Sequence, residues 1–68
     1  MPIQIFVNGQ VTEAPSALSV KELLAFLKID ESRVAVEVNR AIVPRAEHGA
    51  RVVAAGDVLE VVQFVGGG

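Results

Sequence analysis

The sequence contains no cysteine and only one histidine, His48. Without thiols the chain cannot form disulfides, a cysteine-ligated zinc site or a thiol nucleophile, and a single histidine excludes a multi-histidine metal site. Basic residues are also few, since six against eight acidic residues give a formal net charge of -2. Nucleic-acid binding requires a basic face that displaces phosphate counterions, so this charge balance argues against that class of partner.

Long apolar runs are missing as well. No stretch approaches the roughly 18 residues of a membrane-spanning helix, and no signal peptide opens the chain, so we expect no membrane association and a cytoplasmic protein. A length of 68 residues allows one domain at most and leaves little room for an active-site cleft. The hydrophobic content of 51% nevertheless excludes a disordered chain.

The first part of the chain predicts a β-hairpin. Residues 3–7 are typical of a strand whose odd-numbered side chains share one face. Asn8-Gly9 favours a type I′ turn, because both residues tolerate a positive φ. Residues 10–14 then form the return strand, which Pro15 ends.

A helix is predicted over residues 20–28. Ser19 suits the N-cap position, and Glu22 three residues later completes a capping box. Leu18 before the cap and Leu23 can form a hydrophobic staple. An apolar stripe with helical spacing follows, made of Val20, Leu23, Leu24 and Leu27.

A second hairpin and a final strand complete the pattern. Residues 33–38 alternate, with the even-numbered valines on one face, and Asn39-Arg40 forms a turn into residues 41–43. Arg40 is a weak choice where a positive φ is needed, which leaves the turn type open. Residues 45–55 have a mixed pattern, which predicts a loop with little regular structure. Gly56-Asp57 is a turn that leads into the longest strand, over residues 58–65.

Two hairpins with a helix between them indicate an α+β fold, the β-grasp or ubiquitin-like arrangement. In it, one main helix packs on one face of a mixed sheet, and the first and last strands pair in parallel at its centre. Residues 1–65 form this domain, and residues 66–68 form a flexible glycine tail. The sheet side of the core is expected to consist of Ile3, Ile5, Val7, Val34, Val36, Leu59 and Val61.

Few side chains are candidates for catalysis. His48 lies in a predicted loop with no evident nucleophile or partner, so we interpret it as a solvated or partly packed residue rather than an acid–base group. Ser16 and Ser32 have no neighbouring base, and Ser19 is explained by helix capping. The arginines are dispersed among acidic residues and are interpreted as solvated surface; they are Arg33, Arg40, Arg45 and Arg51.

The glycine tail carries the strongest functional signal. Residues without side chains can thread a narrow channel that a Cβ atom would block, and three extended residues reach about 10 Å. The tail ends at the carboxylate of Gly68, which another enzyme can activate without touching a side chain. A compact domain with such an arm is suited to be a protein substrate.

The outer face of the sheet is predicted to bind the partner enzymes. Glu60 should face outward, because a small core does not bury an unpaired carboxylate. Period-two alternation then places Val58, Val62 and Phe64 on that same face. Phe6 points outward from the first strand, so we expect Phe6 and Val62 to share one apolar patch, with Phe64 extending it toward the tail.

Several segments together resemble one known family. They are residues 6–9 (FVNG), 34–39 (VAVEVN), 42–45 (IVPR), 56–57 (GD) and 61–68 (VVQFVGGG). In their order and spacing they resemble the ThiS family, the ubiquitin-like sulfur carriers of bacterial thiamine biosynthesis. The resemblance spans essentially the whole chain, with Arg40 as a departure where the family often has glycine.

This resemblance implies a carrier rather than an enzyme. An adenylating enzyme of the ThiF type would use ATP and magnesium to activate the carboxylate of Gly68, with Gly66 and Gly67 threading the active sites of the partners. Sulfur derived from a cysteine desulfurase would then give a terminal thiocarboxylate. Thiazole synthase (ThiG) would accept that sulfur, and the chain itself would bind no cofactor and no metal.

Three other functions fit the same residues. The small subunit of molybdopterin synthase has the same fold, tail and thiocarboxylate. A ubiquitin-like modifier would instead be conjugated to lysines of target proteins. In a plain binding module the terminal glycines would be incidental.

Overall fold

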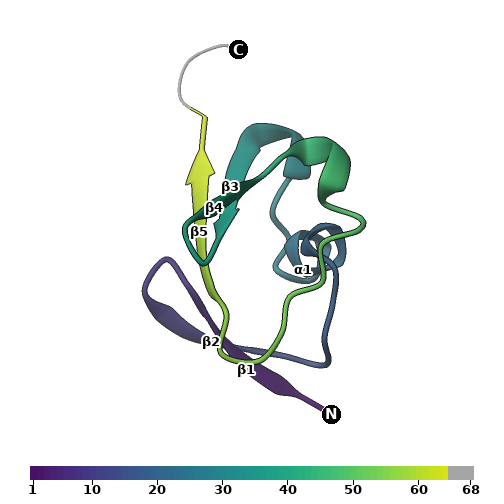
Figure 1. The fold of residues 1–68 in the computed structure, drawn as a ribbon, viewed down its shortest axis with the longest axis vertical. Coiled ribbons are helices and arrows are strands. Elements are labelled where there is room, and N and C mark those ends of the chain that lie inside the picture. The colour runs from purple at the N-terminus through teal and green to yellow at the C-terminus, as the bar shows by residue number, and fades with distance from the viewer. Residues whose placement is uncertain (65–68) are drawn as a thin grey trace.

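The structure, a computed structural model, describes residues 1–64 and has one helix and five strands in a single sheet. The elements are β1 (Ile3–Val7), β2 (Gln10–Ala14), α1 (Val20–Phe26), the 3₁₀ helix η1 (Glu31–Arg33), β3 (Val34–Val38), β4 (Ala41–Val43), the 3₁₀ helix η2 (Arg45–Glu47) and β5 (Val58–Gln63). The strand order is β2-β1-β5-β3-β4 (Figure 1). β1 and β5 pair in parallel and the other neighbours are antiparallel, so the predicted mixed β-grasp sheet is confirmed.

Both hairpins turn through two residues in the left-handed region. Asn8 and Gly9 have φ values of 51° and 81°, which confirms the predicted turn between β1 and β2. Asn39 and Arg40 have φ values of 53° and 69°, so Arg40 adopts the conformation for which its side chain is poorly suited. A two-residue connection that matches the twist of its strands requires positive φ at both positions, and pairing of β3 with β4 imposes it here.

The N-terminus of α1 has the predicted capping box. The Ser19 hydroxyl oxygen accepts from the backbone N–H of Glu22 at 3.1 Å, and the Ser19 backbone N–H donates to the Glu22 carboxylate at 3.0 Å. These two bonds satisfy donors that have no partner within a helix. Ser19 is itself buried, so water does not replace them easily.

Replacing Ser19 by alanine is expected to lower the free energy of unfolding by about 1 kcal/mol, because one capped N–H loses its acceptor. Urea unfolding followed by circular dichroism measures this difference. Ser16→Ala, just outside the helix, is the matched control and should change stability by less than about 0.5 kcal/mol. Equal effects at the two serines would show that the capping box contributes nothing.

The predicted C-terminal end of the helix at Lys28 is wrong by two residues. The helix ends at Phe26, and Lys28 has a φ of 61°. The Lys28 N–H donates to the carbonyl of Ala25 at 3.1 Å, and the Ile29 N–H donates to that of Leu24 at 2.9 Å. This pair of bonds is a Schellman motif, which usually has glycine where lysine stands here, so the sequence carried no stop signal.

The remaining segments differ from their predictions only in detail. The predicted loop over residues 45–55 contains η2, and Val52 forms an isolated bridge with Ser19. β3 begins at Val34 because Arg33 belongs to η1. β5 ends at Gln63, and Val65, which was predicted to close this strand, lies outside the described residues.

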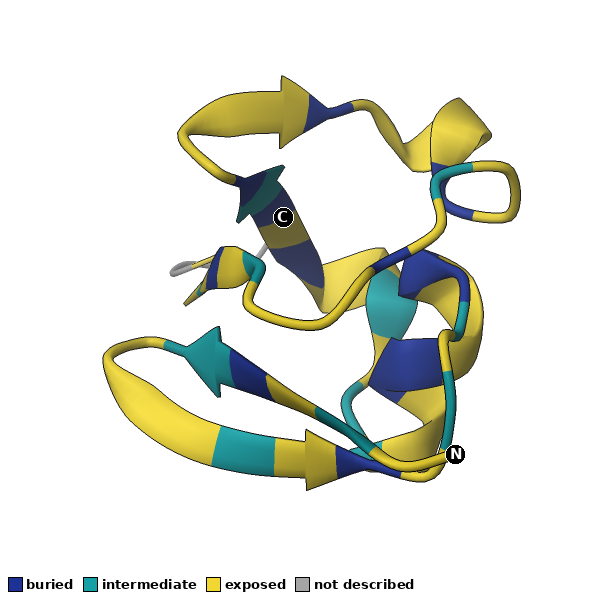
Figure 2. Cartoon of the chain, turned by 60° about the horizontal axis from the view of Figure 1, so that its bottom comes forward, coloured by how far each residue is buried: buried dark blue, intermediate teal, exposed yellow. Residues whose placement is uncertain are grey.

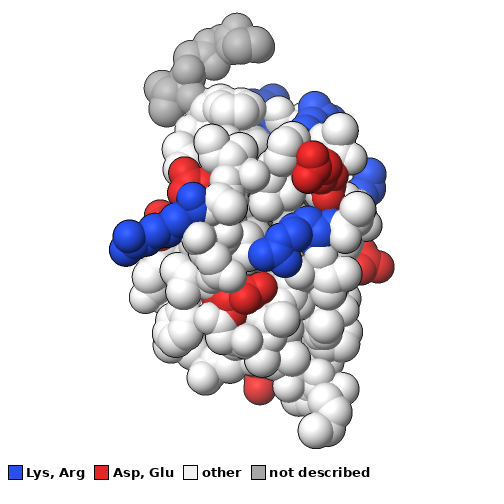
Figure 3. All heavy atoms as spheres, viewed as in Figure 1, with Lys and Arg blue, Asp and Glu red and all other residues white. Residues whose placement is uncertain are grey.

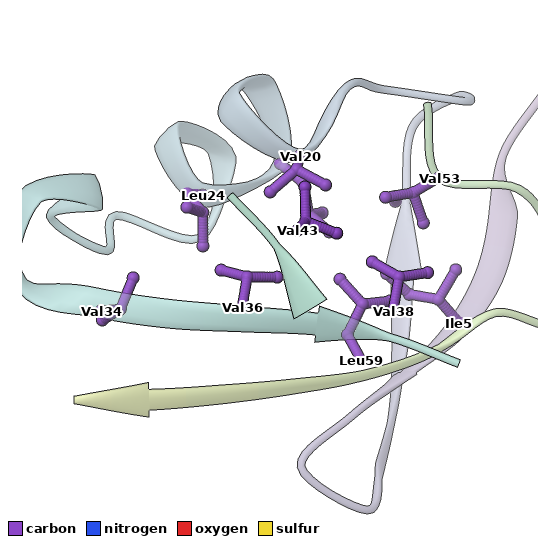
Figure 4. Close-up of a cluster of buried hydrophobic side chains, with 11 residues drawn as sticks. Ile5, Val20, Leu24, Val34, Val36, Val38, Val43, Val53 and Leu59 are labelled. Carbon is purple, nitrogen blue, oxygen red and sulfur yellow. The ribbon is translucent and has the colours of Figure 1, made fainter. Parts of the chain in front are cut away.

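The core lies between α1 and one face of the sheet. Buried and exposed residues alternate along β3 and β5, and one side of the helix is buried (Figure 2). Val20 and Leu24 of the helix point toward Val36 and Leu59 of the sheet (Figure 4). Each of the predicted core residues is buried or packs against the buried cluster, which confirms their inward orientation.

Candidate functional site

The candidate site lies at the end of the central strand. β5 lies between β1 and β3, and its C-terminal end is at the opposite end of the molecule from the N-terminus (Figure 1). In the sequence it leads through Phe64 and Val65 into the glycine tail. Gly66, Gly67 and Gly68 lie outside the described residues, so their predicted role stays a prediction.

Two asparagine side chains hold the backbone of β5. Asn8 accepts from the N–H of Val61 at 2.8 Å and donates to the carbonyl of the same residue at 3.1 Å. Its amide therefore continues the pairing of β1 with β5 past the point where β1 turns away. Asn39, in the equivalent position of the second hairpin, accepts from the N–H of Val58 at 2.9 Å and donates to Asp57 at 3.1 Å.

These contacts fix the strand that carries the tail from both sides. The sequence identified both asparagines only as turn residues. Both residues have positive φ values and their side chains reach β5, but the sequence does not reveal which strand lies beside the turns. Asparagine at the first position of each turn was the only available signal.

The predicted outward orientation of the sheet residues is confirmed. Val62 and Phe64 have exposed fractions of 58% and 60%, whereas Leu59 is fully buried on the other face. Glu60 is also exposed, and Phe6 is partly buried. Val62 and Phe64 therefore lie at the surface, at the end of β5 that leads into the tail.

Phe6 and Val62 both belong to the outer face of the sheet, as expected, but they are not adjacent on it. The cross-strand neighbour of Phe6 is Val58, and the neighbour of Val62 is Ala35 on β3. Val62 lies four residues beyond Val58 on the same strand, which separates the two rows by about 13 Å. The sequence predicted that β1 and β5 are adjacent but could not give their register.

The interpretation of His48 as a solvated or partly packed loop residue is also wrong. Its exposed fraction is 1%. Its Nε2 atom lies 3.1 Å from the carbonyl oxygen of Val43, and its Nδ1 atom lies 2.7 Å from the carboxylate of Glu31. A carbonyl oxygen only accepts, so Nε2–H donates. The imidazole thus links η1 to the end of β4 and is too buried to act on a substrate.

The other polar candidates have structural explanations. The side-chain hydroxyl and the backbone N–H of Ser32 donate to the Asp30 carboxylate and hold the pKa of that group below its ordinary value, with a smaller contribution from Arg33. Basic and acidic side chains are interspersed over the face shown in Figure 3, as predicted for the dispersed arginines. Residues 1–64 contain no group of three or more potential metal ligands. Within the same residues, the single α-helix is too short to span a bilayer.

Comparison with known proteins gives a consistent result. Residues 3–68 match the model of the ThiS family. The chain is 32% identical to the sulfur carrier protein ThiS of Escherichia coli over 97% of this chain and 100% of that protein. It is 38% identical to a thiazole synthase of Paramagnetospirillum magneticum over 97% of this chain, but it spans only 20% of that longer protein.

A solved structure agrees with these sequence matches. The crystal structure of the thiamine biosynthesis protein ThiS from Geobacter metallireducens superimposes with a TM-score of 0.85 at 35% identity, and the match covers 97% of this chain and 100% of that one. Fold, length and sequence therefore agree over the whole described domain, and the family match extends through the terminal glycines. The chain belongs to the ThiS family.

Proposed function

We propose that this protein is a cytoplasmic sulfur carrier of thiamine biosynthesis, with the carboxylate of Gly68 as the carrier group. The observation that supports this most directly is the family match over residues 3–68, because it includes the terminal glycines as well as the fold. The similarity to a named sulfur carrier over its full length supports the same function. The domain presents the tail, and the partner enzymes carry out the catalysis.

The proposed chemistry takes place entirely at the terminal carboxyl group. A ThiF-type enzyme, which supplies the ATP and magnesium, joins a carboxylate oxygen of Gly68 to AMP and releases pyrophosphate. A persulfide sulfur derived from a cysteine desulfurase then displaces AMP and forms an acyl disulfide. A thiol reductant cleaves the S–S bond of this intermediate, which releases the thiocarboxylate. Gly66 and Gly67 let the tail enter each active site, since they present no Cβ atom.

Thiazole synthase is the proposed acceptor of the sulfur. The similarity of this chain to a segment of a thiazole synthase supports the proposal, because there the same kind of domain is part of a longer thiazole synthase chain. The proposed docking surface is the outer face of the sheet, which includes Phe6, Val62 and Phe64. Val58 is added to this surface, since it is the cross-strand neighbour of Phe6.

Intact mass spectrometry tests the carrier function directly. Incubation with the adenylating enzyme, ATP, magnesium and a sulfur source should raise the mass by the difference between one sulfur and one oxygen atom. The change should map to the last peptide, and thiazole synthase should remove it during thiazole formation. An unchanged mass under conditions in which the Escherichia coli carrier is converted would refute the proposal.

A further inference from the structure

Two glutamates lie side by side on the outer face of the sheet. Glu60 on β5 and Glu37 on β3 are direct cross-strand partners. Like charges in this position destabilise a sheet, because the side chains are held about 5 Å apart. The ion pairs within residues 1–64 involve Asp30 and Glu31 but neither of these two carboxylates. The hydrogen bonds of the described side chains do not involve them either.

Apolar side chains flank this carboxylate pair, and most of them are exposed. The next strand residue beside Glu37 is Ile42 on β4, with an exposed fraction of 74%. On β5, Val62 lies two residues after Glu60 and Val58 lies two residues before it. Phe6 on β1 is the cross-strand neighbour of Val58. The cross-strand rows of Val62 and of Val58 each lie about 7 Å from the carboxylates, since outward residues alternate along a strand. The face is therefore apolar with a negative centre.

We infer that this face receives a lysine or arginine side chain of thiazole synthase, flanked by apolar contacts. The inference rests on the proposed function, which supplies the partner. A guanidinium or ammonium group between Glu37 and Glu60 would relieve the repulsion that the isolated chain retains, and the surrounding apolar surface would exclude water from the ion pairs. The negative centre would also orient the partner during encounter.

The same charges argue against other occupants. A second copy related by a twofold axis would bring four carboxylates together, because the same patch lies on both sides of such an interface. An anionic membrane or a nucleic acid would meet the two carboxylates with like charge. A basic protein surface would gain from both features, because it can pair with the carboxylates and pack against the apolar side chains.

The test is the affinity of this chain for purified thiazole synthase of the same organism. The double variant Glu37→Gln/Glu60→Gln should raise Kd by about tenfold or more, because the partner cation loses both acceptors. Raising the NaCl concentration from about 50 to 500 mM should weaken binding of the wild-type chain, whereas the affinity of the double variant should change little. Glu60→Lys should weaken binding further. Glu47→Gln, which removes an exposed carboxylate outside the sheet, should bind like wild type.

A fold readout separates binding from stability. The thermal midpoint of the double variant should equal or exceed that of wild type, because a like-charge contact has been removed. A wild-type Kd in the double variant at low salt, with normal thiocarboxylate formation in the wild-type chain, overturns this inference and leaves the proposed function intact. A wild-type chain that neither accepts sulfur nor binds thiazole synthase overturns both.

Discussion

Deletion of Gly68 is expected to abolish thiocarboxylate formation completely while the fold persists. The deletion withdraws the reacting carboxyl group from the adenylating site by one residue, about 3.5 Å in an extended chain. A displacement of this size prevents reaction, because the attacking oxygen and the phosphorus of ATP must lie within about 3.5 Å of each other. Intact mass spectrometry after incubation with the activating enzyme and a sulfur source measures the loss.

Gly67→Ala tests the width of the partner's channel separately from the reach of the tail carboxylate. This variant keeps the carboxylate in place but adds a Cβ atom, so slowed adenylation would indicate a channel that accepts only glycine. Both variants should have a free energy of unfolding within about 0.5 kcal/mol of wild type, because neither changes a residue of the buried core. Thiamine-independent growth supported by the Gly68 deletion would contradict the proposed mechanism.

Leu59→Ala is expected to have the largest effect on stability. Leu59 has an exposed fraction of 0% and lies on the central strand, between β1 and β3. Truncation of a buried leucine costs about 2 to 5 kcal/mol. A domain of this length has a total stability of about 3 to 10 kcal/mol, so the variant should lose a large share of it. Urea unfolding followed by circular dichroism measures the loss.

Val62→Ala on the same strand is the matched control. Val62 has an exposed fraction of 58% and faces away from the helix, so its truncation should cost less than about 1 kcal/mol. Both variants place alanine on β5, but Leu59 faces the core and Val62 faces away from it. The difference between their losses in stability therefore measures the contribution of burial rather than of strand propensity. Similar losses at both positions would contradict the one-sided core.

Local patterns in the sequence determined the order and kind of the elements. The Asn8-Gly9 turn, the capping box at Ser19 and the alternating valines of β3 each depend on residues a few positions apart, so they can be read without knowing the fold. Strand adjacency followed from the order of hairpins and helix. The three terminal glycines were likewise evident directly from the sequence.

Contacts between distant segments were decided only by the tertiary structure. The register of β1 against β5 pairs Phe6 with Val58, and no local signal fixes it. The buried position of His48 depends on polar partners 5 and 17 residues away, Val43 and Glu31. The carboxylate pair of Glu37 and Glu60 likewise exists only because β3 lies beside β5. Hydrophobic period and turn chemistry are properties of short segments, whereas register and burial follow from how the whole chain packs around one small core.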